Sequence, residues 1–479
     1  MLRPAGTDMG VQVRISFLRW LLNMDAERRE WYRRYREYYD GDQETQLTDR
    51  LRAFLQVKAD EEFNTNYCPI CVDAKAERLK VTGFTEDGEN AEQPQAQLFW
   101  DWWNDNRGDS LQRIVHRASV RDGDAYVIVG WDNDAGEPRY TFEPAYDGEY
   151  GVDVRYDPDK PERVLYAVKH WRVEAENPDD AGYVRRLNVY YPDRIEKYVS
   201  DERTDGGDWD PYTDEAEPRW PIPWMHVDGT PLGVPVIAFR NAPQDYRYGV
   251  SELKNVIPLQ NALNKALIDL MGAADGAAFR VFVGTGSDWA NATISPGTIL
   301  WSESPEARLV AIEPGDLAPI IALKDALAIE VARVTRTPLH YFHGTGQMPA
   351  EGTLKQAEQG LVSRVEEAQT VIGNAWEDVM YLSRRLANAF ANAKLDETVT
   401  VSTRWAPATT RDETAELRRA QQKHALGVPR ERLLGEIGYT ADEIDTMKAS
   451  EEWRSRDALM RDALQGAANT EDGEEPENG

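Results

Sequence analysis

Residues 354–390 read LKQAEQGLVSRVEEAQTVIGNAWEDVMYLSRRLANAF, and this stretch decides the fold. Apolar side chains recur along it at three- and four-residue spacing, which is the period of one face of an α-helix. The stripe consists of Leu354, Ala357, Leu361, Val365, Ala368, Ile372, Ala375, Val379, Leu382 and Leu386. A single helix over this stretch would extend about 55 Å. Gly360 and Gly373 interrupt the stripe, and we expect kinks at these two positions.

Two shorter helices with the same periodicity precede the long one, at about residues 251–271 and 318–336. Pro258 lies inside the first of them and should either bend it or mark its true start. Between the two helices, residues 279–314 have the turns and short apolar runs of a compact β-like insertion. After the second helix, residues 337–352 (TPLHYFHGTGQMPAEG) form a loop that contains glycine and proline.

The N-terminal half mixes helical and strand patterns. We expect helices at 27–39, 64–80 and 111–120, and strands at 124–131, 140–144, 164–172 and 183–191. Three Trp residues within residues 98–103 (LFWDWW) are typical of a core or an interface wedge. The pattern as a whole predicts an α+β fold that is mainly helical, with an antiparallel β unit placed after the first helices.

The C-terminal part is predicted to be helical after one more strand. The strand covers residues 399–405, and helices follow at about 411–426, 430–437 and 441–464. The last residues, 467–479, are acidic and lack apolar residues for a core, so we expect them to be disordered.

The charge balance limits what the surface can bind. The chain of 479 residues carries 55 Lys and Arg against 84 Asp and Glu, a formal net charge of −29. A surface that grips nucleic acid needs Lys and Arg to neutralise phosphates, so this balance argues against a protein that wraps DNA for affinity. A protein that surrounds DNA without gripping it remains compatible with the charge. No run of eighteen apolar residues is present, so we expect no membrane span.

Chemistry-bearing motifs are sparse. Cys68 and Cys71 are the only cysteines, in a C-x-x-C pattern that could be a redox pair, half of a zinc site or two semi-buried thiols. We favour two semi-buried thiols, because no His or Cys lies nearby to complete a zinc site. His340 and His343 are three residues apart, but no carboxylate follows before Glu351, which disfavours a metal site. We therefore expect no catalytic residue, no metal and no cofactor.

The segment at residues 27–39 (ERREWYRRYREYY) interleaves aromatic rings with arginine. Such a pattern can stack nucleic-acid bases. It also fits a helix whose rings pack against neighbours while Arg and Glu pair three and four residues apart. We favour packing, because the Glu side chains would repel phosphates.

Three sequence motifs, together with the order of elements, resemble one known family. They are Tyr38-Tyr39-Asp40-Gly41-Asp42-Gln43; the stretch from Asn64 through Val72 to Arg78-Leu79 and Gly83-Phe84; and Arg336-Thr337-Pro338 before the long helix. Together they resemble the portal proteins of tailed phages, of the Gp6-like type. The resemblance covers about residues 25–465.

The resemblance implies a non-enzymatic virion subunit, assembled in the host cytoplasm. It implies a ring, usually of twelve subunits, at one capsid vertex. Duplex DNA would pass non-specifically through the ring, and the implied partners are the terminase large subunit, the head-completion or adaptor protein, and the major capsid and scaffolding proteins.

The resemblance also assigns regions. It places an N-terminal wing region at 1–248, the first stem helix at 249–278, the clip at 279–316, the second stem helix at 317–337, the tunnel loop at 338–352, a long kinked wing helix and strand at 353–410, the crown helices at 411–466, and an acidic tail at 467–479.

Within these regions, DNA-facing residues can be suggested. The tunnel-loop candidates are His340, Tyr341, His343 and Gln347. In the second stem helix, Lys324, Arg333 and Arg336 could form positive rings in the channel, or could pair with Asp325 and Glu330. Rival interpretations are a portal-like protein that carries an enzymatic activity, and another ring or scaffold protein of the virion.

Overall fold

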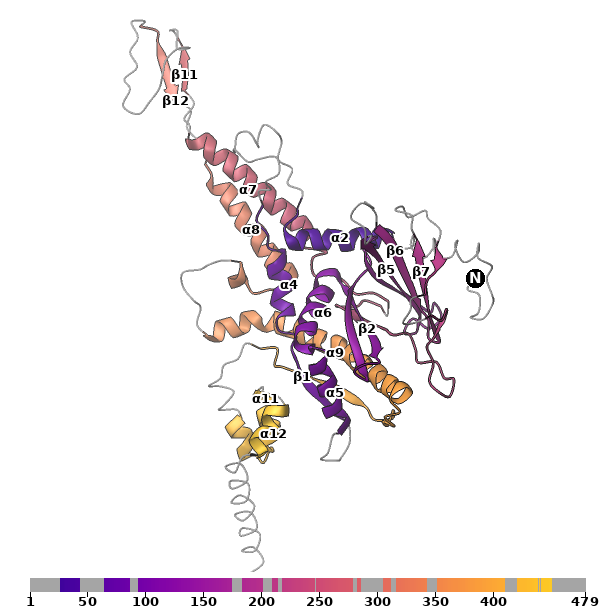
Figure 1. Cartoon of the computed structure of the whole chain (residues 1–479). Coiled ribbons are helices and arrows are strands. Elements are labelled where there is room, and N and C mark those ends of the chain that lie inside the picture. The colour runs from indigo at the N-terminus through magenta and orange to yellow at the C-terminus, as the bar shows by residue number, and fades with distance from the viewer. Residues whose placement is uncertain are drawn as a thin grey trace, which may run out of the picture. The chain divides into compact units, whose positions relative to one another are not determined.

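The computed structural model divides the chain into two compact units (Figure 1). Unit 1 comprises Met1–Arg29, Lys75–Val250 and Val362–Gly479, and unit 2 comprises Glu30–Ala74 and Ser251–Leu361. The structure describes residues 26–43, 64–86, 94–174, 183–200, 209–213, 218–245, 247–278, 282–285, 305–311, 316–342, 351–409, 420–437, 439 and 441–449. In these described residues, no helix is both long and apolar enough to cross a membrane.

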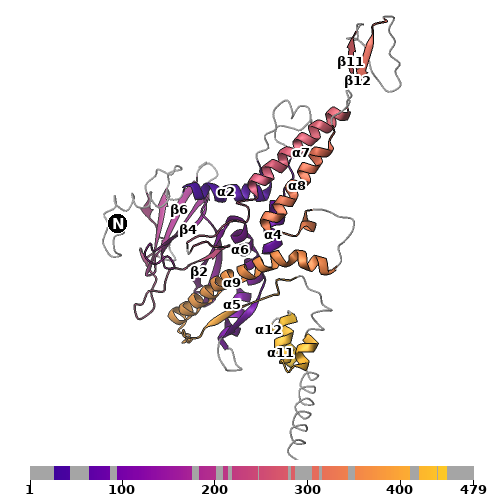
Figure 2. The same cartoon turned by 180° about the vertical axis from the view of Figure 1, so that it is seen from behind.

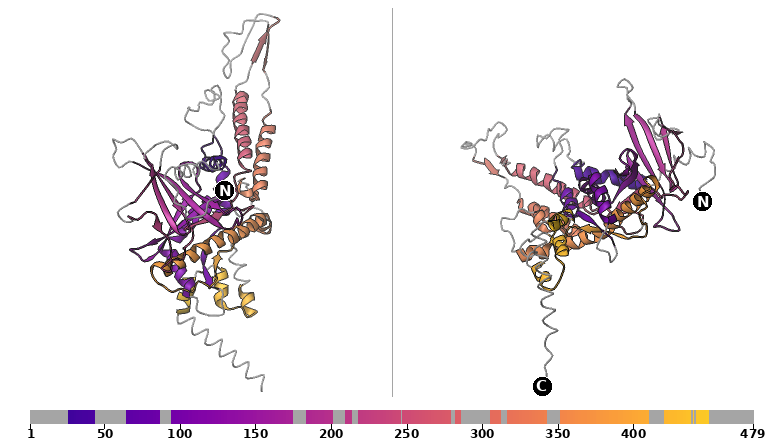
Figure 3. Two further views of the ribbon diagram at one scale, coloured as in Figure 1. Left: turned by 90° about the vertical axis from the view of Figure 1, so that its right-hand side faces the viewer. Right: turned by 60° about the horizontal axis from the view of Figure 1, so that its bottom comes forward.

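Unit 1 holds three antiparallel sheets, and Figure 3 shows them from two further sides. One sheet has the order β10 (Val236–Arg240), β2 (Asp124–Asp132), β3 (Glu137–Pro144). The largest has the order β4 (Gly151–Tyr156), β5 (Val164–Glu174), β6 (Tyr183–Tyr190), β7 (Arg194–Ser200), β8 (Asp210–Pro211), with β9 (Ile222–Pro223) also paired to β7. The third joins β1 (Val81–Glu86) to β13 (Val401–Trp405). The four strands predicted in the N-terminal half are confirmed: β2, β3 and β5 are one to three residues longer than predicted, and β6 ends one residue earlier.

The helices of unit 1 bury the tryptophans of the LFWDWW stretch. These helices are α5 (Pro94–Asp105), α6 (Gly108–Asp122) and most of α9 (Glu351–Phe390). Trp103 is fully buried, and its ring centroid lies 4.7 Å from that of Trp376 on α9. A Cβ on Gly108 would come within 2.2 Å of the Trp103 ring, so only glycine fits at the start of α6. The tryptophans are therefore core residues.

The long helix α9 is confirmed, and its helical assignment continues through both glycines. Gly373 allows a close approach to β13, because a Cβ there would lie 3.2 Å from Nε1 of Trp405. Gly360 similarly faces Arg336, at 3.5 Å from its Cβ. These glycines are explained by close packing, and the predicted kinks stay a prediction.

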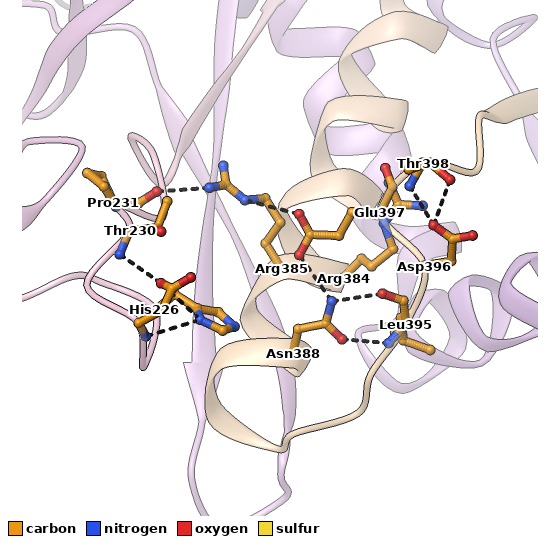
Figure 4. A network of polar contacts seen from close by, with 11 residues as sticks. His226, Thr230, Pro231, Arg384, Arg385, Asn388, Leu395, Asp396, Glu397 and Thr398 are labelled. Atoms are coloured by element: carbon orange, nitrogen blue, oxygen red, sulfur yellow. Dashed lines mark hydrogen bonds and ion pairs between the residues drawn. The ribbon is translucent and has the colours of Figure 1, made fainter.

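The chain that returns from α9 to β13 is held against the end of the helix (Figure 4). Arg384 is buried and donates from Nη1 to the carbonyl of Val399 at 2.9 Å and from Nη2 to that of Glu397 at 2.7 Å. Asn388 pairs with both backbone groups of Leu395, accepting from its N–H at 2.7 Å and donating to its carbonyl at 3.0 Å.

Unit 2 contains a helical hairpin of α7 (Ile257–Ala278) and α8 (Ala318–Thr335), which lie side by side in Figures 1 and 2. The strands β11 (Phe282–Thr285) and β12 (Arg308–Ala311) pair antiparallel within the insertion between the two helices. Residues 286–304 of the insertion lie outside the described residues. The predicted start of the first helix was six residues too early, because Pro258 occupies the first turn of α7, where its missing N–H costs no hydrogen bond.

Two further helices contribute to unit 2: α2 (Ala26–Asp40) and α4 (Cys68–Ala76). The helix predicted at 64–80 is therefore shorter at both ends. At its start the side-chain oxygen of Asn66 accepts from the N–H of Cys68 at 3.1 Å, which caps the helix. Residues 30–74 cluster with 251–361, whereas the sequence interpretation placed all of 1–248 in one region.

The described C-terminal helices are a turn at 420–425, α11 (Arg430–Ile437) and α12 (Ala441–Ala449). The remainder of the predicted helices at 411–426 and 441–464, and the tail at 467–479, lie outside the described residues.

Candidate functional site: the helical hairpin, its base and the segment after it

Helix α8 presents apolar side chains that the described part of the chain does not cover. Leu323 is 53% exposed, Ile321 45%, Val334 44% and Ile329 37%. The buried residues of the helix lie in its C-terminal half, at Ala328, Val331 and Ala332. An apolar helix face left in water is unfavourable at about 25 cal/mol per Å² of apolar surface. Such a face is typical of a protein–protein contact surface.

The basic residues of this helix have acidic neighbours within the chain. Nζ of Lys324 lies 3.5 Å from Oδ1 of Asp325, and Arg333 pairs with Glu330 one turn earlier. Arg336 follows the last turn in a left-handed conformation, with φ 51°, and its N–H closes the helix against the carbonyls of Ala332 and Arg333. Within one chain, Lys324 and Arg333 thus form ion pairs with Asp325 and Glu330, which is one of the two predicted alternatives. That these two residues line a channel stays a prediction.

Only part of the expected tunnel loop is described. His340 and Tyr341 lie in a short 3₁₀ turn, η1 (Leu339–Tyr341), whereas His343 and Gln347 lie outside the described residues. Tyr341 is 39% exposed. Nε2 of His340 lies 3.9 Å from a carboxylate oxygen of Glu358 on α9. The loop therefore begins from a position held by α9.

The residue after this turn anchors the segment. Phe342 is buried, and its ring meets that of Tyr67 edge to face, at a centroid distance of 5.5 Å. The start of the predicted loop is thus fixed by packing against the chain just before α4.

A group of side-chain amides, three of them buried, binds the base of the hairpin to the end of α2 and the start of α4. We call Gln43, Asn66, Gln260 and Asn264 the amide cluster. Gln260 donates to the carbonyl of Thr65 and accepts from the N–H of Tyr67 at 3.0 Å. Asn264 accepts from the N–H of Thr65 at 3.1 Å and donates to Oε1 of Gln43 at 2.6 Å.

The other half of the amide cluster closes the end of α2. Asn66 donates to the carbonyls of Tyr38 and Tyr39, each at 3.0 Å. Gln43 donates to the side-chain oxygen of Asn66 at 3.0 Å. Gly41, with φ 93°, ends the helix in a conformation that favours glycine. Two of the three sequence motifs therefore meet in one buried polar network.

This network was missed at the level of sequence. The motifs were noted, but no contact between them could be assigned. A signal did exist: Gln260 and Asn264 follow Ile257 by three and seven residues, which places two amides on the buried side of an apolar helix.

The remaining candidates are structural. Cys68 and Cys71 are free, as predicted, and buried, and burial raises the pKa of the Cys68 thiol to about 12. On α2 the rings of Tyr32, Tyr35 and Tyr38 are buried, which confirms that this arginine-rich helix packs its aromatic side. Within the described ranges, no three His, Cys, Asp or Glu side chains are grouped so as to hold a metal ion.

The exposed apolar side chains of α8 are typical of a surface that contacts another protein chain. The sequence profile of the family described as "Phage portal protein, SPP1 Gp6-like" matches residues 18–457. Because this match spans most of the chain, the chain belongs to that family of phage portal proteins, which are structural components of the virion.

Individual relatives agree with this membership. The chain is 24% identical over 434 residues to a portal protein of Mycobacterium phage D29, covering 84% of this chain and 81% of that one. It is 23% identical over 431 residues to a portal protein of Mycobacterium phage L5, with the same coverage.

Two solved structures also show a partial likeness. A chain from the neck of an empty gene transfer agent particle gives a TM-score of 0.41 at 12% identity, covering 76% of this chain and 90% of that one. A chain from the virion of a native gene transfer agent particle gives a TM-score of 0.37 at 11% identity, covering 75% and 85%.

Proposed function

We propose that copies of this chain close into a ring at one capsid vertex, and that the ring is the channel through which duplex DNA is packaged and ejected. The uncovered apolar face of α8 supports this most directly. In a closed ring, one face of each subunit contacts a different face of the next subunit. An apolar face on each copy is therefore covered, and the assembly does not continue into an open filament.

The helical hairpin is the part of the chain suited to the channel wall. We assign α7 and α8 to the stem, residues 279–316 to the clip, and residues 338–352 to the tunnel loop. Residues 1–248 and 353–410 form the wing, and 411–466 form the crown. The clip would contact the terminase large subunit and later the head-completion or adaptor protein, and the outer parts would contact the major capsid and scaffolding proteins.

The charge of the chain suits a duplex that moves. A net charge of −29 per subunit opposes lasting contacts with phosphates. Ion pairing of Lys324 with Asp325 and of Arg333 with Glu330 further reduces the positive charge available on α8. His340, Tyr341, His343 and Gln347 would then supply brief polar or aromatic contacts with DNA.

The ring does not need catalysis of its own, because the terminase would supply the energy for packaging. We expect the purified protein to hydrolyse no ATP. Turnover of ATP that is abolished by a point substitution in this chain would contradict a purely structural role.

The deciding experiment is a native mass measurement with negative-stain images of the same sample. We expect a species close to twelve times the chain mass of 54.4 kDa, seen as rings with a central hole. A stable monomer or dimer at several salt concentrations would contradict the ring.

A further inference from the structure

We propose that the amide cluster sets the number of subunits in the ring by fixing the direction of α7 in its subunit. This role depends on the ring proposed above. It assigns a function to Gln43, Asn66, Gln260 and Asn264 that goes beyond holding the fold together.

The cluster forms hydrogen bonds only with the first turns of α7. Gln260 and Asn264 lie three and seven residues after the first residue of the helix, Ile257. The rest of α7, from Asn264 to Ala278, extends about 21 Å beyond these hydrogen-bonded residues. A small rotation at the base is therefore amplified along the hairpin.

The hydrogen bonds of the cluster define one orientation of the helix. Gln260 contacts a backbone carbonyl and a backbone N–H, of Thr65 and Tyr67, so its amide can face only one way. Asn264 repeats this arrangement with the N–H of Thr65 and the oxygen of Gln43. A third residue of α7 is also held by a hydrogen bond, because the hydroxyl of Tyr38 donates to Oδ1 of Asn261 at 2.7 Å.

Three of the four members are buried, and all four use both ends of their amides. Gln260 is 0% exposed, Gln43 1% and Asn264 6%. A buried polar network of this kind contributes little net stability compared with an apolar core of the same shape, but it penalises every arrangement that breaks its hydrogen bonds. The network is thus suited to selecting one orientation of α7.

Ring closure depends on such a geometry. In a ring, the angle between the two contact faces of a subunit fixes the number of copies, and rings of twelve and thirteen differ by only about 2° per subunit. The hairpin carries the uncovered apolar face of α8, so its direction contributes to that angle. A rotation of this size moves the far end of α7 by about 1 Å or less, which hydrogen bonds at its base can control.

The test is the distribution of ring sizes of the full-length Gln260→Met variant, measured by native mass spectrometry and by rotational symmetry of stained rings. Methionine keeps the volume of glutamine but leaves the carbonyl of Thr65 and the N–H of Tyr67 without this partner. We expect the ratio of neighbouring ring sizes to the wild-type size to rise about tenfold.

A matched control exists in unit 1. Gln112 is 1% exposed, accepts from the N–H of Val81 at 2.7 Å and donates to Asp109 at 3.0 Å. Gln112→Met should lower the melting temperature similarly but keep the wild-type ring size. If Gln260→Met retains the wild-type distribution, or if Gln112→Met broadens it equally, the cluster does not set ring size.

A milder variant covers the case in which Gln260→Met does not fold. Tyr38→Phe removes only the hydroxyl bond to Asn261, and we expect a smaller shift in ring size in the same direction. An unchanged distribution in Tyr38→Phe would then overturn the proposal. A wild-type protein that forms no rings would instead contradict the proposed function itself.

Discussion

His116 is the buried residue whose chemistry is most clearly constrained. It is fully buried on α6, with Nδ1 2.9 Å from the carbonyl of Leu79 and Nε2 2.9 Å from Nε1 of Trp376. Because the Trp indole can only donate, Nε2 must accept, and the proton of the neutral ring is on Nδ1. Burial lowers the pKa of His116 to about 4.

The depressed pKa predicts that the protein loses stability in mild acid. In the unfolded chain this histidine takes up a proton near its ordinary value of 6.5, whereas the folded chain resists protonation down to about 4. Stability is therefore full above the unfolded pKa and falls as the pH drops through this window. We expect His116 to account for about 2 kcal/mol of lost unfolding free energy between pH 7 and pH 5, measured by chemical denaturation.

The comparison with His116→Gln isolates this effect. Glutamine can occupy the site without titrating, so the variant should lose less stability than the wild type between the same two pH values. Equal pH dependence in both proteins would show that His116 is not the acid-sensitive group.

The burial of some residues could be predicted from the sequence, whereas the contact partners of others could not. The aromatic side chains of LFWDWW could be predicted to be buried, because large apolar area is favourable to bury in any context. The partners of Gln260 could not be predicted, because they are backbone groups at residues 65 and 67, almost 200 positions away. No local pattern encodes a contact at that distance.

The end of α9 shows how an element is held by a few polar side chains. Arg384 binds two backbone carbonyls of the returning chain. The adjacent Arg385 is more exposed: it donates to the carbonyl of Pro231 at 2.8 Å in an exposed hydrogen bond and lies 3.9 Å from Glu397 (Figure 4). We expect Arg384→Met to lower the unfolding free energy by about 2 kcal/mol, because two carbonyls lose a charged donor. Arg385→Met is the control and should change it by less than about 0.5 kcal/mol. Similar losses in both variants, by thermal or denaturant unfolding, would contradict the clamp.

A charged substitution on α8 tests whether its exposed apolar side chains form the contact between subunits. Leu323 is 53% exposed within the chain, so Leu323→Asp should fold normally and yet fail to assemble, because an aspartate in an apolar contact is left without compensation. Val227, which is 87% exposed in unit 1, provides the control substitution Val227→Asp. Native mass measurement should give monomers for the first variant and rings for the second. Rings of normal size from Leu323→Asp would exclude this face from the subunit contact.

Elements were predicted better at their centres than at their ends. The long helix and α8 follow from apolar periodicity alone, since each repeats one pattern over many turns. The start of α7 depended on where Pro258 sits within it, and the start of α4 depended on a cap from Asn66. Caps and turns are made by single residues, so periodicity does not locate them.

For the molecule as a whole, the two compact units each combine segments that are distant in the sequence. Residues 30–74 cluster with 251–361, although residues 75–250 of unit 1 separate them in the chain. A contiguous region at 1–248 is the simplest division of a sequence, but contacts such as those of the amide cluster join distant segments. The order of elements indicated the family correctly because that order does not depend on which segments touch.

The charge of the proposed ring leads to the last prediction, which concerns Lys324 and Arg333. The double variant Asp325→Asn/Glu330→Gln removes the acidic partners of both and raises the charge of each chain by two. If these residues line the channel, the rings should bind duplex DNA about tenfold more tightly than the wild type near 50 mM salt, and the gain should vanish as salt screens it.

The double variant Glu366→Gln/Glu367→Gln changes the charge of the ring by the same amount, at two exposed positions of α9. Fluorescence anisotropy of a labelled duplex should therefore show no gain for this control. An equal gain in both variants would mean that only the total charge matters and that Lys324 and Arg333 do not face the DNA. A gain confined to Asp325→Asn/Glu330→Gln would mean that ion pairing on α8 keeps the wall of the channel from holding the duplex.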